Sequence, residues 1–83
     1  MSTPITPRAR SDRALNVVLE RLRQERGFSR EMLAHEAGVT TSTYNRLANG
    51  SVAPGWWTVR QVARALDVRL VELARMVEAE EEG

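Results

Sequence analysis

The stretch from Phe28 to Gly50, FSREMLAHEAGVTTSTYNRLANG, contains two short helical patterns separated by a single glycine. Ser29 precedes the first pattern and Thr40 precedes the second. Both residue types are good helix N-caps, because their side-chain oxygens accept hydrogen bonds from backbone N–H groups of the first turn. Gly38 separates the patterns, and glycine readily adopts the left-handed conformation that ends a helix. The stretch therefore predicts two short helices joined by a tight turn.

Each of these two predicted helices has one apolar face. The inner positions are Leu33, Ala34 and Ala37 in the first helix, and Tyr44, Leu47 and Ala48 in the second. Such a tight turn excludes an antiparallel arrangement, so we expect the helices to cross at a steep angle. The outer face of the second helix then projects from the domain. That face carries Thr41, Ser42, Asn45, Arg46 and Asn49.

The projecting face is polar and contains no acidic residue. A helix fits the major groove of DNA, where the base edges present hydrogen-bond donors and acceptors. A carboxylate on such a helix would be repelled by the phosphates, whereas hydroxyl, amide and guanidinium groups would not. The composition of this face is therefore typical of a helix that reads a DNA duplex.

Three further helical patterns flank this pair. One begins at Asp12 and ends before Gly27, one runs from about Trp56 to Leu66, and one follows Asp67. Their apolar positions recur at helical spacing: Leu15, Val18, Leu19 and Leu22; Trp56, Val59, Val62, Ala63 and Leu66; Leu70, Leu73, Ala74 and Val77. No segment alternates apolar and polar residues as a half-buried strand does. We therefore expect an all-α fold, a compact bundle of five helices.

The chain of 83 residues fits one domain with two distinct ends. Residues 1–11 contain two prolines and several Ser or Thr residues, which predicts a flexible N-terminal arm. Residues 12–77 form the predicted helical domain. Residues 78–83 contain four glutamates and predict an acidic C-terminal tail after a fraying last helix. These boundaries leave no room for an effector-binding domain after residue 77.

The charge distribution suits an anionic partner. All twelve cations are arginines, and only seven of the eleven acids precede residue 78, so the body of the chain is basic. There is no apolar run near the length of a membrane span and no secretory signal pattern, which favours a cytoplasmic location and no membrane partner. Cysteine is absent and His35 is the single histidine, so we expect no metal site and no cofactor.

Catalysis is not expected from these residues. The chain offers no Ser-His-acid set, no paired carboxylates at a pocket and no glycine-rich loop that would cradle phosphate. A binding function therefore remains, either on DNA or on another protein.

An ordered set of short motifs resembles the phage-repressor and Cro-like (Xre-type) helix-turn-helix family. The matching segments are residues 28–34, 37–40, 49–50, 54 and 62–68, and the similarity covers about Leu15 to Ala74. The resemblance implies a five-helix, lambda-repressor-like DNA-binding domain in which the second and third helices form the DNA-binding pair. It also implies sequence-specific binding to double-stranded DNA, usually as a homodimer on a near-palindromic site.

The family pattern assigns roles to positions in this chain. Base contacts are implied for Thr41, Ser42, Asn45 and Arg46, and phosphate contacts for Arg30 and Asn49. Arg30 stands where the family usually has Gln. Arg46 is the best candidate for a bidentate contact with guanine. We also consider Arg8, Arg10 and Arg13 as contacts from the arm, and Leu73, Met76 and Val77 as a dimer seam.

Two departures from the family pattern leave alternatives open. The family often has a glutamate where this chain has Ala48, and that glutamate pairs with an arginine at the position of Arg23. Arg23 must therefore pair elsewhere or face DNA. Trp57 occupies a usually polar position.

We expect a transcriptional regulator, most simply a repressor. The alternatives are an antitoxin or phage immunity factor on the same fold, and a protein-interaction module that has lost DNA binding.

Overall fold

The computed structural model describes residues 7–50 and 55–83, and these residues form five helices without a strand. The helices are α1 (Pro7–Glu25), α2 (Arg30–Ala37), α3 (Thr41–Ala48), α4 (Trp56–Ala65) and α5 (Leu70–Glu82). The predicted all-α class is therefore confirmed. None of the described helices is both long enough and apolar enough to cross a bilayer.

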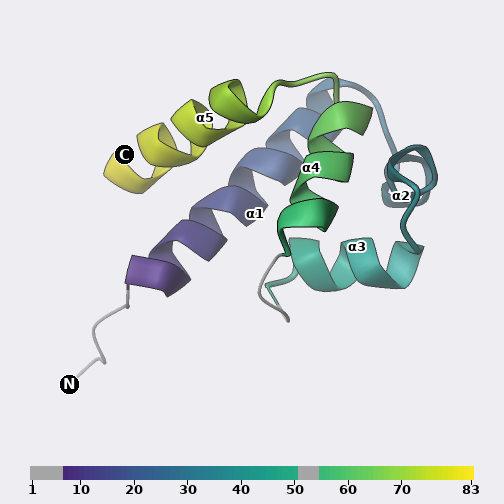
Figure 1. Ribbon diagram of the computed structural model, residues 1–83, viewed down its shortest axis with the longest axis horizontal. Helices are drawn as coiled ribbons and strands as arrows, with labels where there is room; N and C mark the ends of the chain where they lie inside the picture. The colour runs from purple at the N-terminus through teal and green to yellow at the C-terminus, as the bar shows by residue number, and fades with distance from the viewer. Residues whose placement is uncertain (1–6, 51–54) are drawn as a thin grey trace.

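The helices pack in two groups around one core. The long helices α1 and α5 lie side by side, while α2 packs against both α3 and α4 (Figure 1). The largest fully buried side chains come from α1, α2, α3 and α4 and from the residue that follows α4. They are Val18, Leu19, Leu33, Tyr44, Leu47, Val62 and Leu66. All seven lie at positions predicted to face inward. Helix α3 lies along the lower edge of the molecule in this view, below α4, and it packs against α1 (Figure 1).

The helix ends of the central pair have the predicted caps. The hydroxyl of Ser29 accepts a hydrogen bond from the backbone N–H of Met32, and that of Thr40 accepts one from Thr43, both at 3.0 Å. Gly38 ends α2 in the left-handed region, with φ of 73°. These local features position α3 directly after a sharp change of direction.

The first helix begins earlier than the sequence pattern indicated. It starts at Pro7, so the part of the predicted arm from residue 7 to residue 11 is helical. Proline suits the first position of a helix, because its φ is already helical and its missing N–H would have no partner there. The remainder of the predicted arm, residues 1–6, lies outside the described residues.

The acidic end is also helical. Helix α5 continues to Glu82, so the prediction of a fraying helix and a separate tail from residue 78 was wrong. Glutamate is a good helix former. In addition, Glu80 forms an ion pair of 2.7 Å with Arg21 of α1, which ties the last turns of α5 to the long first helix.

Trp56 is a further correction. The sequence pattern placed it on the buried face of α4, but 70% of this residue is exposed. It occupies the first position of the helix, before the turn that contains the buried Val62 and Ala63. Its neighbour Trp57 is exposed as well. The two indoles therefore lie at the surface beside the start of α4.

Substitution of Gly38 tests the turn that positions α3. Gly38→Ala should lower the free energy of unfolding by about 1–2 kcal/mol, because a Cβ is unfavourable in the left-handed region. The added Cβ makes no steric clash, since nothing lies within 4 Å of it. Thermal unfolding measures the effect. Gly38→Asn is the matched control, because it adds a Cβ at the same position in a residue that adopts the left-handed region more readily. Equal stability of the two variants would contradict this account of the turn.

Candidate nucleic-acid interface

The outward face of α3 is set by the two side chains that the helix buries. Tyr44 and Leu47 lie in the core, which turns the opposite side of this short helix toward solvent. On that side Ser42, Arg46 and Asn49 are exposed, and Thr41 and Asn45 are half-buried. The five predicted DNA-contacting positions of α3 are thus at least partly accessible. Their contact with DNA stays a prediction.

Arg30, at the first position of α2, connects three helices. Its Nη2 atom forms an ion pair of 2.7 Å with Glu20 Oε1 of α1. Its Nη1 atom donates hydrogen bonds of 3.3 Å to the side-chain oxygens of Asn45 in α3 and of Asn49, the C-cap of that helix. Three of the predicted site residues are therefore joined directly by side-chain contacts.

Glu20 also holds Arg23, through a 2.6 Å contact between Glu20 Oε2 and Arg23 Nε. Arg23 in turn donates to the backbone carbonyl of Phe28 at 2.7 Å, before α2 begins. Arg23 thus finds a partner within its own helix in the absence of a glutamate at position 48. Glu20 was not among the predicted site residues. Its position three residues before Arg23, one helical turn away, was the available signal.

Tyr44 lies beneath this ionic cluster, which consists of Glu20, Arg23 and Arg30. The residue is fully buried, and its hydroxyl lies within reach of the Arg23 guanidinium. Burial raises the pKa of the phenol from 10.0 to about 12, and the negative charge of Glu20 adds to the rise. The positive charges of Arg23 and Arg30 oppose it. The phenol is therefore neutral beneath the cluster.

The candidate arm cations lie at different places. Arg13 lines a hollow together with Asn16, Asn49 and Gly50, so it borders the end of α3. Arg10 and Arg13 also line a second hollow with Glu80 and Glu81 of α5. Both arginines belong to the helix α1 rather than to an arm. Arg8 falls within α1 too, but its side chain lies outside the described residues.

The proposed dimer seam is only partly at the surface. Leu73 is 3% exposed and belongs to the core, which corrects its assignment to a seam. Met76 and Val77 are half-buried and pack against that core. The reason is that α5 lies along α1, so the inner face of α5 covers the core of the domain.

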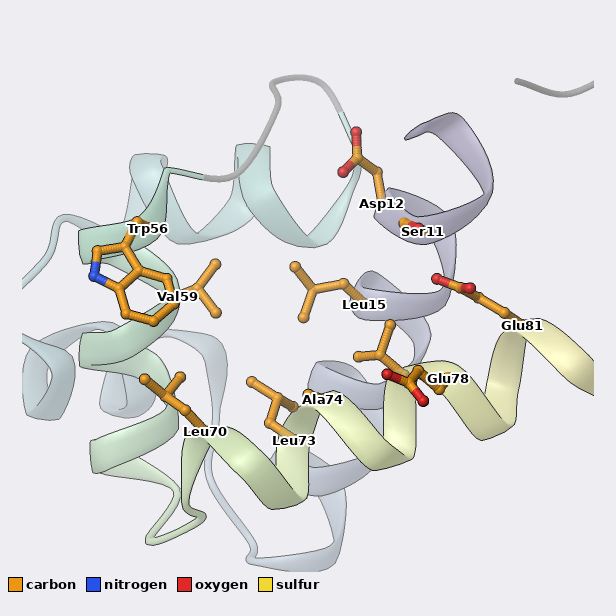
Figure 2. Close-up of a pocket in the computed structure, with 11 residues that line it drawn as sticks. Ser11, Asp12, Leu15, Trp56, Val59, Leu70, Leu73, Ala74, Glu78 and Glu81 are labelled. Carbon is orange, nitrogen blue, oxygen red and sulfur yellow. The ribbon is translucent and has the colours of Figure 1, made fainter. Parts of the chain in front are cut away.

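An apolar groove runs between α1, α4 and α5 (Figure 2). Its apolar lining consists of Leu15, Trp56, Val59, Leu70, Leu73, Ala74 and Val77. The carboxylates of Asp12, Glu78 and Glu81 lie at the end away from Trp56 (Figure 2). The groove thus combines one exposed indole, an apolar floor and an acidic end.

Comparison with known proteins identifies the class of this domain. The family model described as a helix-turn-helix domain matches residues 14–76, most of the chain. The chain belongs to this helix-turn-helix family, and membership indicates DNA binding. A search of curated proteins and a search of solved structures gave no match.

The buried phenol predicts a loss of stability at alkaline pH. Since the folded pKa is about 12 and the unfolded value 10.0, the stabilisation is complete below pH 10 and is lost as pH rises toward 12. The loss amounts to about 3 kcal/mol for two pKa units. Tyr44 is the single tyrosine, so ultraviolet absorbance follows its titration directly.

Tyr44→Phe is the matched control for this titration. It keeps the buried ring and removes only the hydroxyl, so its stability at neutral pH should stay within about 1 kcal/mol of the original. Denaturant unfolding at pH 9 and pH 11.5 should show a decline that is smaller in Tyr44→Phe. An identical decline in both proteins, or a phenol that titrates near 10, would contradict the burial.

Proposed function

We propose that this protein is a sequence-specific regulator of transcription, a repressor of the phage-repressor and Cro-like type, that reads the major groove of DNA with α3. The observation that carries the proposal is the outer face of α3. It presents hydroxyl, amide and guanidinium groups on a helix that projects at the edge of the domain (Figure 1). Occupation of an operator by such a domain would block other proteins from the same DNA.

Within this proposal Thr41, Ser42, Asn45 and Arg46 contact base edges. Arg46 is exposed, and its guanidinium matches the two acceptors of guanine in the major groove.

Phosphate contacts come from groups around the same face. Asn49 and Arg30 lie at adjoining ends of α3 and α2 and are in direct contact. Arg13 borders the same end of α3, and Arg10 lies one helical turn before it in α1. This arrangement supports a row of backbone-contacting groups along one side of the recognition helix, which would position the helix in the groove.

We further propose that the protein acts as a homodimer in the cytoplasm. Met76 and Val77 remain candidates for the seam, beside the apolar groove with the exposed Trp56 at its rim. Two copies related by a two-fold axis would read a near-palindromic site, with one half-site for each α3. An antitoxin or immunity factor would use the same surfaces.

A protein-interaction module without DNA binding is the second candidate. The groove and the two exposed tryptophans favour it, since apolar surface of this kind marks protein contacts more often than DNA contacts. The projecting cationic face of α3 favours the regulator instead.

A binding selection from random duplex DNA distinguishes the two functions. The full chain is immobilised, and the retained sequences are read at two salt concentrations. The regulator should recover one motif, with two half-sites if it binds as a dimer. Retention of no DNA even at low salt would refute the regulator and leave the interaction module.

Replacement of Arg46 tests the base contact. Arg46→Ala should weaken binding to the selected duplex by about 1–3 kcal/mol and relax the preference at one base pair. Arg64→Ala is the control, because it removes the same charge from an exposed position at the far end of α4. Equal weakening by Arg46→Ala on all sequences, measured by fluorescence anisotropy, would show that Arg46 contacts only phosphate.

A further inference from the structure

Arg30 is held from behind before any DNA is present. Glu20 contacts its Nη2 atom at 2.7 Å, and the carboxylate itself is only 18% exposed. A cation at the first position of a helix is unfavourable next to the positive end of the helix dipole, and a carboxylate beside it offsets that cost. Glu20 therefore fixes the position of the Arg30 guanidinium at the junction of α1, α2 and α3.

The fixed guanidinium orients two amides of α3. Its Nη1 atom donates to Oδ1 of Asn45 and to Oδ1 of Asn49, each at 3.3 Å. Asn45 and Asn49 are four residues apart and so lie on the same helix face. In each planar amide the oxygen faces Arg30, which is a donor only, and the NH₂ group occupies the other branch. An inverted amide would place two donors against each other.

This orientation has a consequence for base reading. An asparagine that recognises adenine bidentately must accept from the adenine amino group with its oxygen and donate to N7 with its nitrogen. One lone pair of the Asn45 oxygen already accepts from Arg30, so the NH₂ group is the part of the amide that remains wholly free for DNA. Acceptors in the major groove are N7 and O6 of guanine and O4 of thymine.

We infer that Arg30 is a specificity-determining residue, which holds the Asn45 amide so that its NH₂ group selects a guanine or thymine edge rather than adenine. The inference rests on the proposed duplex-reading function of α3. It gives Arg30 a second role beside phosphate contact, and it makes Glu20 the positioning residue behind Arg30.

Selection from random duplex DNA with four proteins tests the inference. Comparison of the original chain with Asn45→Ala identifies the base pair that Asn45 reads. It is the pair at which the original chain has a base preference and Asn45→Ala has none. Arg30→Lys keeps the positive charge, but a single ammonium cannot take the place of two Nη atoms that contact Glu20 and both amides. Arg26→Ala is the control, since it removes an exposed arginine of the α1–α2 connection.

The original chain should select guanine or thymine at the pair assigned to Asn45. Arg30→Lys should lose that preference at least fivefold, with adenine gaining most, while the salt dependence of its binding stays unchanged. Arg26→Ala should keep the preference. In the absence of DNA, nitrogen-15 NMR should show altered side-chain NH₂ resonances of Asn45 and Asn49 in Arg30→Lys, with backbone resonances elsewhere preserved.

Four results would overturn the inference. The first is selection of adenine by the original chain at this pair, and the second is an unchanged preference in Arg30→Lys. The third is an Asn45→Ala motif identical to the original. The fourth is that the side-chain amide resonances of Asn45 and Asn49 are unaltered in Arg30→Lys. The first three all require a recovered motif, so sequence-specific duplex binding survives them, although the third removes Asn45 from the proposed base contacts. Failure of the original chain to select any motif removes the proposed function and the inference together.

Discussion

The burial of Tyr44 and Leu47 is the constraint on which the candidate interface depends. Helix α3 has eight residues, and these two anchor it in the core, so its opposite side must face outward. The turn at Gly38 sets the direction in which that helix leaves α2. Since the anchors and the turn are apolar or backbone features, the polar face can vary in sequence without loss of the fold. Within this one short helix, the buried residues therefore determine the fold and the outward residues determine the proposed base preference.

The ionic cluster of Glu20, Arg23 and Arg30 adds a second level of order. One carboxylate lies between two guanidinium groups and joins α1 to the start of α2. Partly buried ion pairs contribute little net stability, because desolvation offsets much of the attraction between the charges. Their effect here is geometric, since they fix Arg30, which contacts Asn45 of α3. The cluster also leaves a net positive charge beside the face proposed for DNA.

The sequence predicted the elements that depend on local chemistry. Ser29, Thr40 and Gly38 act within a few residues of their own position, so the ends of α2 and α3 followed from residue type alone. The errors involve contacts distant in the chain. Helix α5 continues beyond residue 78, where Glu80 pairs with Arg21 of α1. The exposure of Trp56 depends on how α4 packs beside α1 and α5. Likewise, no local pattern could show that Arg30 contacts both Glu20 and the asparagines of α3.

The most direct test of the central claim is an NMR titration of the nitrogen-15-labelled chain with duplex DNA at low salt. The outward face of α3 should respond first. The largest shifts are predicted at Ser42, Asn45, Arg46 and Asn49, with smaller ones at the start of α2. Shifts concentrated instead around the groove beside Trp56, or no shifts at any ratio of DNA to protein, would contradict the assignment of α3 as the recognition helix.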